Sequence, residues 1–585
     1  MRTSFPALVL LAIAMLLPPA AGALPIPQTP LPTTPVFQGQ VATPHPAAAP
    51  VVPRHPFMAP NERSNLHDDA YQTDTYRGYG PLGRGGISVT STSYVADCGS
   101  VTFDSHGRIV TVCVGIGSTV MKLLDPHTLA ELASYTLPAR SLLGGGGGNP
   151  FQNFTGGGYF YLDNQDRAVL GASDHHLYVI ADSPDGTPAL KLVRDVDLTA
   201  HIADSDGIVS VLPDWSGRNW FVTKAGVVGT IDRASPTVKS VDTHEVIGNS
   251  IAVDDTGGVY IVTNAAMYRF DADASGAPKV TWREKYDNVG IQKPGQSQAG
   301  SGTTPTLMGK DLVSITDNAD PMDVVVYHRT AGYKGAREVC KQPVFAKGAS
   351  SSDQSLIGIA KSMVVENNYG YQGPQSTEAS LTTTPGLTRV DINPDGHGCH
   401  VAWTSNEIAP SVVPKLSLGA GLVYTYTKSP GHLDDPWYLT TIDFATGKTV
   451  FRALAGTGIG FNNNYAPVTF GSDGTAYVGT LGGLVALHDN QPPPPLVSAP
   501  LPSLKLTVSC SRKARVSGTG VESVEFRVAG ARSQTRARAP FSIQLKHAAH
   551  GRLTAVVTLV DGRIVKLRKT VRSCRRGATQ ALAGS

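Results

Sequence analysis

Two short runs in the middle of the chain are rich in side-chain oxygen atoms. The first contains Asp317, Asn318 and Asp320, and the second is Glu366-Asn367-Asn368. Carboxylate and amide oxygens are the ligands that Ca²⁺ prefers, so both runs are candidate metal or ligand sites. The structural alternative is that Asn and Asp satisfy turn backbone at strand ends. The full set of candidates is Asp317, Asn318, Asp320, Glu366, Asn367, Asn368, Asn249 and Asn464.

Other residue patterns give less support for catalysis. His397 and His400 flank Cys399, but two histidines are too few for a stable zinc site, and the cysteine is expected in a disulfide. The adjacent His175 and His176 would point to opposite faces of a strand. The Gly-x-Ser-x-Gly motif of serine hydrolases does not occur in the chain, which contains only sequences that match it in part. No catalytic residue is therefore assigned, and Ca²⁺ is the one cofactor that the sequence suggests.

The elements that must position these side chains are short strands in a repeated unit. The clearest copy spans residues 465–489, where turns at Ser472-Asp473-Gly474 and Gly482-Gly483 separate three strands. Similar units recur roughly every 45 residues from near Val95 to near Phe461. About eight such units, each of about four strands, are typical of a β-propeller.

An aromatic residue begins the return strand in three of these units. Trp282, Trp403 and Phe451 each follow an Asp and a Gly in the same order along the chain. The Asp can cap a turn, the Gly can supply a positive φ, and the ring can pack flat between neighbouring units. These three residues are predicted to dock one propeller blade on the next.

The repeats resemble those of the quinoprotein-type β-propeller superfamily. The shared pattern is APV at residues 466–468, DGTAYVG at 473–479 and GLVALHD at 483–489. The resemblance covers roughly residues 95–490 and implies a fold more specifically than a function, because the superfamily includes dehydrogenases and assembly scaffolds. Its dehydrogenases typically hold a quinone beside a disulfide between adjacent cysteines, with Ca²⁺ bound by Glu, Asn and Asp. No two cysteines are adjacent here, so a quinone-dependent oxidoreductase is the least favoured interpretation.

The last repeat unit is incomplete. It has only three strands before four consecutive prolines, residues 492–495, end the sheet. A propeller closes its ring to avoid a frayed edge. We therefore expect residues 86–94, GISVTSTSY, to pair with the last unit as its fourth strand.

The N-terminus has the features of a secretory signal peptide over residues 1–23. Arg2 precedes an apolar stretch at residues 7–17, and Ala21-Gly22-Ala23 fits a cleavage site. The apolar stretch is too short to span a bilayer, and no transmembrane segment is predicted. We therefore expect a secreted or envelope-associated protein with disulfides, although spacing alone leaves other connectivities open. The expected pairs are Cys98 with Cys113, Cys340 with Cys399, and Cys510 with Cys574.

Composition divides the remaining chain into segments. Residues 24–85 are rich in Pro, Ala and Thr without a period, which predicts a disordered spacer. Residues 86–490 are the predicted propeller, and 491–503 are a proline-rich linker. Residues 504–575 alternate like a small antiparallel sandwich that resembles bacterial immunoglobulin-like modules, and 576–585 are a disordered tail. The predicted fold class is all-β: an about eight-bladed β-propeller followed by a small immunoglobulin-like β-sandwich.

The C-terminal module is strongly basic. Residues 504–576 carry 17 Lys and Arg against three acidic residues, a net charge of +14, which leaves −11 for the rest of a chain of net charge +3. Such a module is attracted to anionic cell-envelope polymers. The alternative is a merely solvated surface. Nucleic acid is not a predicted partner, because the context is exported and no aromatic residues alternate with the basic ones.

Two classes of function follow from these observations. The favoured one is a secreted β-propeller binding or scaffold protein, with a ligand or protein partner on the propeller face and the basic module near an anionic envelope. The alternative is an extracellular metal-assisted lyase or hydrolase acting on carbohydrate or lactone substrates. Stoichiometric Ca²⁺ in the purified protein, with polar residues from several blades converging on it, would favour the enzyme, whereas an empty apolar or plugged channel would favour the scaffold.

Overall fold

The computed structural model describes residues 24–140, 149–183, 187–497 and 499, and in the C-terminal module 501–509, 512–518, 520–528, 532–536, 539–545, 551–559 and 563–571. The all-β prediction is confirmed over this part of the chain. Its helical segments are three short 3₁₀ turns, η2 (Pro150–Gln152), η3 (Pro374–Thr377) and η4 (Ile459–Phe461). No helix among these residues is long and apolar enough to cross a membrane.

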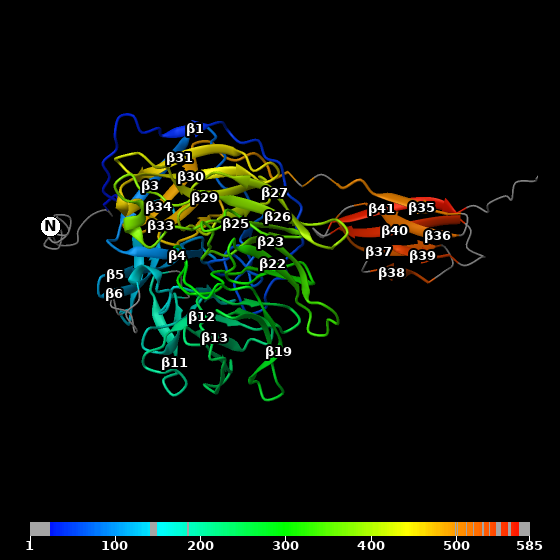
Figure 1. Cartoon of the computed structure of the whole chain (residues 1–585), viewed down its shortest axis with the longest axis horizontal. Helices are drawn as coiled ribbons and strands as arrows, with labels where there is room; N and C mark the ends of the chain where they lie inside the picture. Colours follow the sequence, from blue (N-terminus) through cyan, green and yellow to red (C-terminus); the bar gives the residue numbers. More distant parts are fainter. Residues whose placement is uncertain are drawn as a thin grey trace, which may run out of the picture.

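Eight antiparallel sheets follow one another over residues 87–489 and form a β-propeller. They are β4–β7, β8–β11, β12–β15, β16–β19, β20–β23, β24–β27, β28–β31, and β32–β34 with β3. In Figure 1 they follow a circle, from β5 past β13, β22, β26 and β30 to β33, which lies beside β4. In chain order these strands are β3 (Ile87–Ser93), β4 (Asp97–Phe103), β5 (Ile109–Gly115), β6 (Ser118–Leu124), β7 (Glu131–Leu137), β8 (Phe160–Leu162), β9 (Ala168–Gly171), β10 (His176–Ala181), β11 (Lys191–Asp197), β12 (Ile208–Pro213), β13 (Asn219–Thr223), β14 (Val227–Ile231), β15 (Val238–Asp242), β16 (Ala252–Val253), β17 (Val259–Val262), β18 (Ala266–Ala272), β19 (Pro278–Lys285), β20 (Thr306–Met308), β21 (Leu312–Thr316), β22 (Asp323–His328), β23 (Glu338–Pro343), β24 (Ile357–Ile359), β25 (Ser362–Glu366), β26 (Leu387–Ile392), β27 (Cys399–Ser405), β28 (Lys415–Ser417), β29 (Leu422–Lys428), β30 (Pro436–Asp443), β31 (Thr449–Thr457), β32 (Val468–Phe470), β33 (Ala476–Thr480) and β34 (Gly483–Asp489).

The ring closes through β3, as the sequence predicts. This strand pairs with β34 along its whole length, from Ile87 opposite Asp489 to Ser93 opposite Gly483. The completed sheet then packs on the first one, where Phe103 and Tyr477 share a buried apolar cluster. Pairing β3, which precedes the first sheet, with the last strand of the ring removes the free edge that an open ring would expose.

Two of the three expected disulfides are confirmed. Cys98 on β4 bonds to Cys113 on the adjacent β5. Cys340 on β23 bonds to Cys399 on β27 and so joins neighbouring sheets. The third expected pair, Cys510 with Cys574, lies outside the described residues, as do the expected signal peptide and C-terminal tail.

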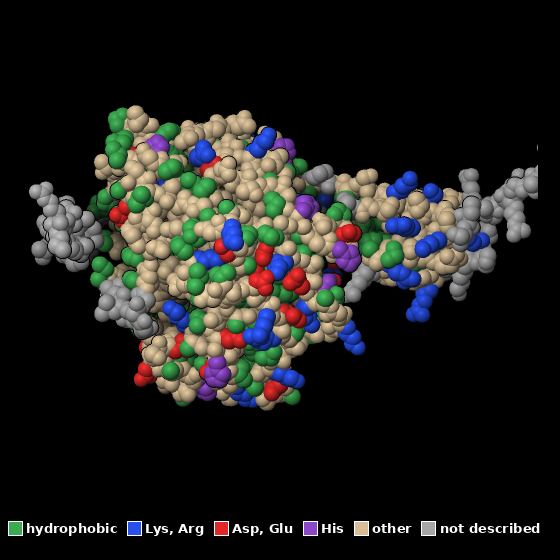
Figure 2. All heavy atoms as spheres, in the orientation of Figure 1, with side chains coloured by type: hydrophobic (Ala, Val, Ile, Leu, Met, Phe, Trp, Pro, Cys, Tyr) green, Lys and Arg blue, Asp and Glu red, His purple; other side chains and the backbone are tan. Residues whose placement is uncertain are grey.

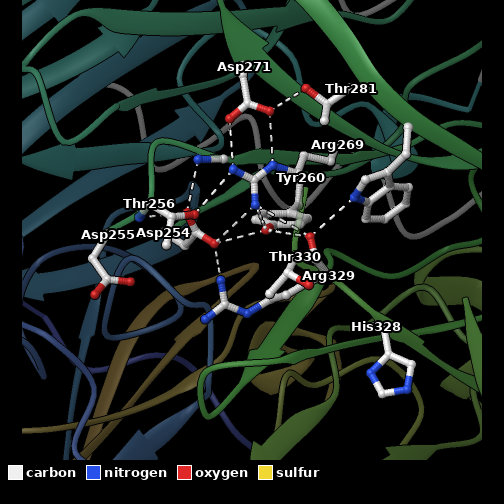
Figure 3. Close-up of polar contacts among 12 residues, drawn as sticks. Asp254, Asp255, Thr256, Tyr260, Arg269, Asp271, Thr281, His328, Arg329 and Thr330 are labelled. Carbon is white, nitrogen blue, oxygen red and sulfur yellow. Dashed lines mark hydrogen bonds and ion pairs between the residues drawn. The ribbon is translucent and has the colours of Figure 1, made fainter. Parts of the chain in front are cut away.

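A recurring ion pair shapes the turn between the first two strands of successive sheets. In three sheets an Asp accepts hydrogen bonds from the turn backbone and pairs with an Arg four residues later. In the fourth sheet Gly258 stands where the Arg would be, and a Cβ there would lie 2.6 Å from Arg269. Arg269 and Arg329, the latter from the following sheet, approach Asp254 instead (Figure 3). The three local pairs are Asp104–Arg108, Asp163–Arg167 and Asp214–Arg218.

The predicted disordered spacer over residues 24–85 is wrong. The segment first lies along the seventh sheet, where β1 (Phe37–Gly39) pairs with β31. It then enters the ring, and every residue from Ser64 to Tyr76 is buried. Within this stretch β2 (Thr75–Tyr76) runs parallel to β28.

The N-terminal segment is ordered because the innermost strand of each sheet has an edge that no other strand of its sheet pairs with. The first strand of five sheets donates a backbone N–H to a carbonyl of the N-terminal segment, at distances of 2.8 to 3.1 Å. Buried backbone groups need such partners, and the carbonyls of this N-terminal segment, which is rich in turns, supply them. We call residues 64–76 the plug. The donor and acceptor pairs are Leu162–Ser64, Val253–Ala70, Leu307–Tyr71, Gly358–Thr73 and Leu416–Asp74.

The C-terminal module consists of two further antiparallel sheets, set apart from the ring in Figure 1. Their inward side chains, among them Val524, Phe526 and Leu553, form a separate core. One sheet has the order β35-β36-β39 and the other β38-β37-β40-β41. The strands are β35 (Lys505–Val508), β36 (Lys513–Ser517), β37 (Val521–Val528), β38 (Gln534–Arg536), β39 (Ser542–Gln544), β40 (Gly551–Leu559) and β41 (Ile564–Val571).

Candidate functional site

A cavity of about 360 Å³ lies inside the ring. Its walls come from β4 and β5 and from the segments before β4, β8, β24 and β32, so three neighbouring sheets and one more distant sheet contribute. The plug contributes Leu66 and His67 to the lining. Most of the remaining lining is apolar and includes Val112, Phe154 and Tyr465. The site is therefore a pocket between the plug and the surrounding sheets, which we call the axial cavity.

Three polar atoms of this lining are buried without a hydrogen-bond partner. They are Nε2 of His67, Oδ1 of Asp97 and Oδ2 of Asp353. They come from the plug, the first strand of the ring and the segment before β24. A buried polar group without a partner costs about 1–3 kcal/mol. Three residues that line one cavity each carry such an atom, which marks the cavity as a candidate place for a bound molecule.

The imidazole of His67 is held in place by a buried cluster of charged and polar side chains. Its Nδ1 lies 3.0 Å from Oδ1 of Asp74, and Nζ of Lys415 lies 2.6 Å from the same oxygen. Oγ of Ser355 lies 3.0 Å from Nδ1 as well. Burial opposes ionisation of Asp74, but Lys415 and then His67 hold its pKa below the usual value. With Nδ1 engaged in this way, Nε2 is the ring nitrogen left without a partner.

The two cavity carboxyls have raised pKa values. Burial raises the pKa of Asp353 to about 7, although hydrogen bonds from Ser297 partly oppose this rise. Burial raises the pKa of Asp97 to about 6, although Asn464 donates a hydrogen bond of 2.9 Å to its Oδ2. Near neutral pH these groups stand close to the point where they gain or lose a proton, which suits hydrogen bonding in either direction.

Of the ligand candidates proposed from the sequence, some line the cavity and others form hydrogen bonds to the segments that line it. Asn464 lines the cavity, and Oδ1 of Asn249 accepts a hydrogen bond of 3.3 Å from Tyr159 in its wall. Asn368 links two groups, because its Nδ2 donates to Glu366 at 2.6 Å and its Oδ1 accepts from the backbone N–H of Asp353 at 2.9 Å.

The second oxygen-rich run therefore supports the segment that carries Asp353. Burial raises the pKa of Glu366 well above its usual range. Asn367 accepts the backbone N–H of Ser351, again in the same segment. The first run, Asp317 to Asp320, lies outside the cavity lining.

Two of the three predicted docking residues reach the next sheet. Nε1 of Trp282 donates to the carbonyl of Arg329 at 3.1 Å, and Nε1 of Trp403 donates to that of Phe444 at 2.9 Å. Phe451 is also buried but stacks on Phe37 of the N-terminal segment, with ring centroids 5.4 Å apart. The same position in the repeat thus contacts a neighbouring sheet or the wrapped N-terminal segment.

His67, Asp97 and Asp353 did not stand out in the sequence. Each is a single residue outside any motif, and His67 lies in a segment predicted to be disordered. The one available signal was the plug itself, because HDDAYQTDTY at residues 67–76 contains no proline and has two tyrosines, unlike the Pro- and Ala-rich residues before it.

No known family matches the chain. A protein of Archaeoglobus fulgidus described as uncharacterized is 28% identical over 320 residues, and the match covers 49% of this chain and 62% of that protein, less than two thirds of its length.

Three solved structures are similar to the chain in fold. BamB from Moraxella catarrhalis is 12% identical, with a TM-score of 0.40 over 71% of this chain and 97% of its own. Streptogramin B lyase is 8% identical, with a TM-score of 0.35 over 70% and 99%. The computationally designed Ika8 protein is 12% identical, with a TM-score of 0.43 over 68% and 97%. Identities and scores this low carry no functional argument.

Proposed function

We propose that this protein is a secreted, eight-bladed β-propeller that binds a small organic ligand in its axial cavity. The observation that carries the proposal is the convergence of three unpartnered polar atoms, on His67, Asp97 and Asp353, in one largely apolar pocket. The two disulfides support secretion, because such bonds persist in oxidising compartments.

The lining also suggests the chemical class of the ligand. The pocket volume of about 360 Å³ falls within the range of small-molecule sites, roughly 300–1,000 Å³. Asp97 and Asp353 offer carboxylate oxygens as acceptors, and Phe154 and Tyr465 offer apolar contact. A ligand that carries hydroxyl or ammonium donors on an apolar body matches this arrangement.

The test is a binding screen with matched variants. Thermal unfolding of the purified protein is measured with a library of small amines and polyols, and native mass spectrometry looks for a ligand that co-purifies. We expect a compound that raises the Tm of the wild type and of Asp204→Asn, an exposed control, but not of Asp353→Asn. If no compound or co-purified mass is found, or if Asp353→Asn responds as the wild type does, the cavity is not the binding site.

A second candidate function is catalysis in the same cavity. The observation that favours it is His67 in the cavity lining, whose Nδ1 is engaged by Asp74 while Nε2 has no hydrogen-bond partner, as a general base requires. This candidate corresponds to an extracellular lyase or hydrolase acting on carbohydrate or lactone substrates. Turnover on a panel of such compounds that is lost in His67→Gln, with ligand binding retained, would establish it.

The C-terminal module is proposed to be an immunoglobulin-like sandwich that holds the protein near anionic envelope polymers. Arg527, Lys566 and Arg568 are exposed on β37 and β41, and Figure 2 shows basic side chains spread over this module. Attraction of this kind is long-range and weakened by salt. We expect retention on a heparin resin that collapses as salt rises. Equal retention of a chain ending at Pro502 would contradict this assignment.

A further inference from the structure

Three aspartates from separate segments meet outside the axial cavity. Asp287 follows β19, Asp317 follows β21, and Asp323 begins β22. One carboxylate oxygen of each lies within 4.8 Å of those of the other two. Asp317 and Asp323 are 0% and 5% exposed, and Asp287 is exposed at the surface.

The backbone fixes the three segments against one another. The N–H of Asn318 donates to the carbonyl of Asp287 at 3.1 Å, and the N–H of Val289 donates to the carbonyl of Asn318 at 3.0 Å. Oδ1 of Asp317 accepts the N–H groups of Asp323 at 2.8 Å and of Ala319 at 3.0 Å. The Asp317 carboxylate is therefore oriented by its first oxygen, which leaves the second to face the cluster.

The remaining oxygens of the buried pair have no donor. Oδ2 of Asp317 and Oδ1 of Asp323 are buried without a hydrogen-bond partner, and so is Oδ1 of the adjacent Asn318. Two such carboxylates close together in a desolvated site cannot both be charged unless a cation lies between them. A buried pair of this kind holds either a shared proton or a metal ion.

The basic side chains nearby are already engaged. Lys341 pairs with Asp287, with Nζ 2.5 Å from Oδ2, and Lys293 donates to the carbonyls of Ala319 and Ser350. Among the described residues, no Lys or Arg forms an ion pair with Asp317 or Asp323 within 4.0 Å.

We propose that Asp287, Asp317 and Asp323 bind one Ca²⁺ ion. Carboxylate oxygens are its preferred ligands, and Ca²⁺ tolerates the irregular geometry of a site made from loops, with water completing the coordination. The ion would tie the segment before β20 to the turn between β21 and β22 and so rigidify one sheet of the ring. This inference is independent of the ligand proposed for the axial cavity.

The structure also revises the grouping of the sequence candidates. Asp317 belongs to the proposed site, but Asp320 does not, because its Oδ1 accepts the backbone N–H of Gly348 at 2.6 Å. Asp320→Asn is therefore a matched control: it removes one carboxylate charge from the same turn without removing a proposed ligand.

The test measures Ca²⁺ binding to full-length protein after treatment with a chelator. Isothermal titration with CaCl₂ is expected to give one saturable site per chain, and added Ca²⁺ is expected to raise the Tm. Asp317→Asn and Asp323→Asn should each weaken binding at least tenfold and abolish the rise in Tm, while Asp320→Asn should keep both. Asn resembles a protonated Asp in shape, so these variants are expected to fold, and their circular dichroism checks this.

Two results would overturn the inference. The first is a wild type that shows no saturable Ca²⁺ binding while Asp317→Asn raises its Tm near pH 7, which is the behaviour of a pair that shares a proton. The second is Ca²⁺ binding that persists in both Asp317→Asn and Asp323→Asn, which would place the ion elsewhere.

Discussion

Lys415 is expected to be the anchor of the plug, and replacing it with Met tests this directly. Its ammonium is fully buried and lies 2.6 Å from Oδ1 of Asp74, 3.1 Å from Oδ2 of Asp68 and 2.6 Å from the carbonyl of Leu66. The latter three residues belong to the plug, whereas Lys415 begins β28. Met keeps most of the side-chain volume but leaves Asp74 charged and without its main partner.

The magnitude follows from the burial of the charges. Breaking a buried ion pair from one side costs about 3–5 kcal/mol, because the remaining charge is left uncompensated. Burial raises the pKa of Asp68 well above its usual range, so Asp74 is the carboxylate that balances Lys415. A loss of this size should increase the opening of the plug by about two to four orders of magnitude, since about 1.4 kcal/mol corresponds to a factor of ten.

Hydrogen exchange measured by mass spectrometry is the assay, because it reports local opening of residues 64–76 separately from global unfolding. We expect much faster exchange of this segment and a lower Tm in Lys415→Met. The exposed Lys448→Met serves as the control and should match the wild type. Adding Asp74→Asn to Lys415→Met removes the unpaired charge and should restore part of the protection. Unchanged exchange in Lys415→Met would refute the argument that this ion pair holds the plug.

Three further predictions concern the cavity and the ring. The folded-state pKa of Asp353, about 7, lies above its unfolded value of about 3.8, so its contribution to stability is complete below about pH 4 and is lost as the pH rises through 7. Asp353→Asn should therefore flatten the fall in Tm between pH 4 and 7, and an unchanged pH profile would count against the raised pKa. Trp282→Phe keeps a ring between neighbouring sheets but leaves the Arg329 carbonyl without its donor, and should cost about 1–3 kcal/mol in thermal unfolding; an unaltered Tm would mean that water replaces the bond. Deleting residues 24–94 removes the plug and β3 together and should give an aggregating protein by size-exclusion chromatography, because the edge of β34 is then free; a stable monomer would show that the ring closes without β3.

The sequence was most informative where the structure repeats. Turn residues and alternating strands are local features, so the repeat at residues 465–489 revealed the sheets and, through its missing strand, the pairing of residues 86–94 with β34. Cys98 and Cys113 lie on adjacent strands and were predicted from their proximity in sequence. The sequence was least informative for residues 24–85, because an abundance of Pro and Ala indicates only that no regular element forms, not that the segment is disordered.

The amino-acid order by itself thus determined the all-β class, the repeated strands, the strand that completes the last sheet and two disulfides. Tertiary structure alone decided the candidate sites. His67, Asp97 and Asp353 come from separate parts of the chain and line one pocket only when the ring closes around the plug, and Asp317 meets Asp287 and Asp323 only through the packing of connecting loops. Local patterns specify elements because turns and strands depend on nearby residues, whereas a pocket depends on which distant segments fill the centre of the ring.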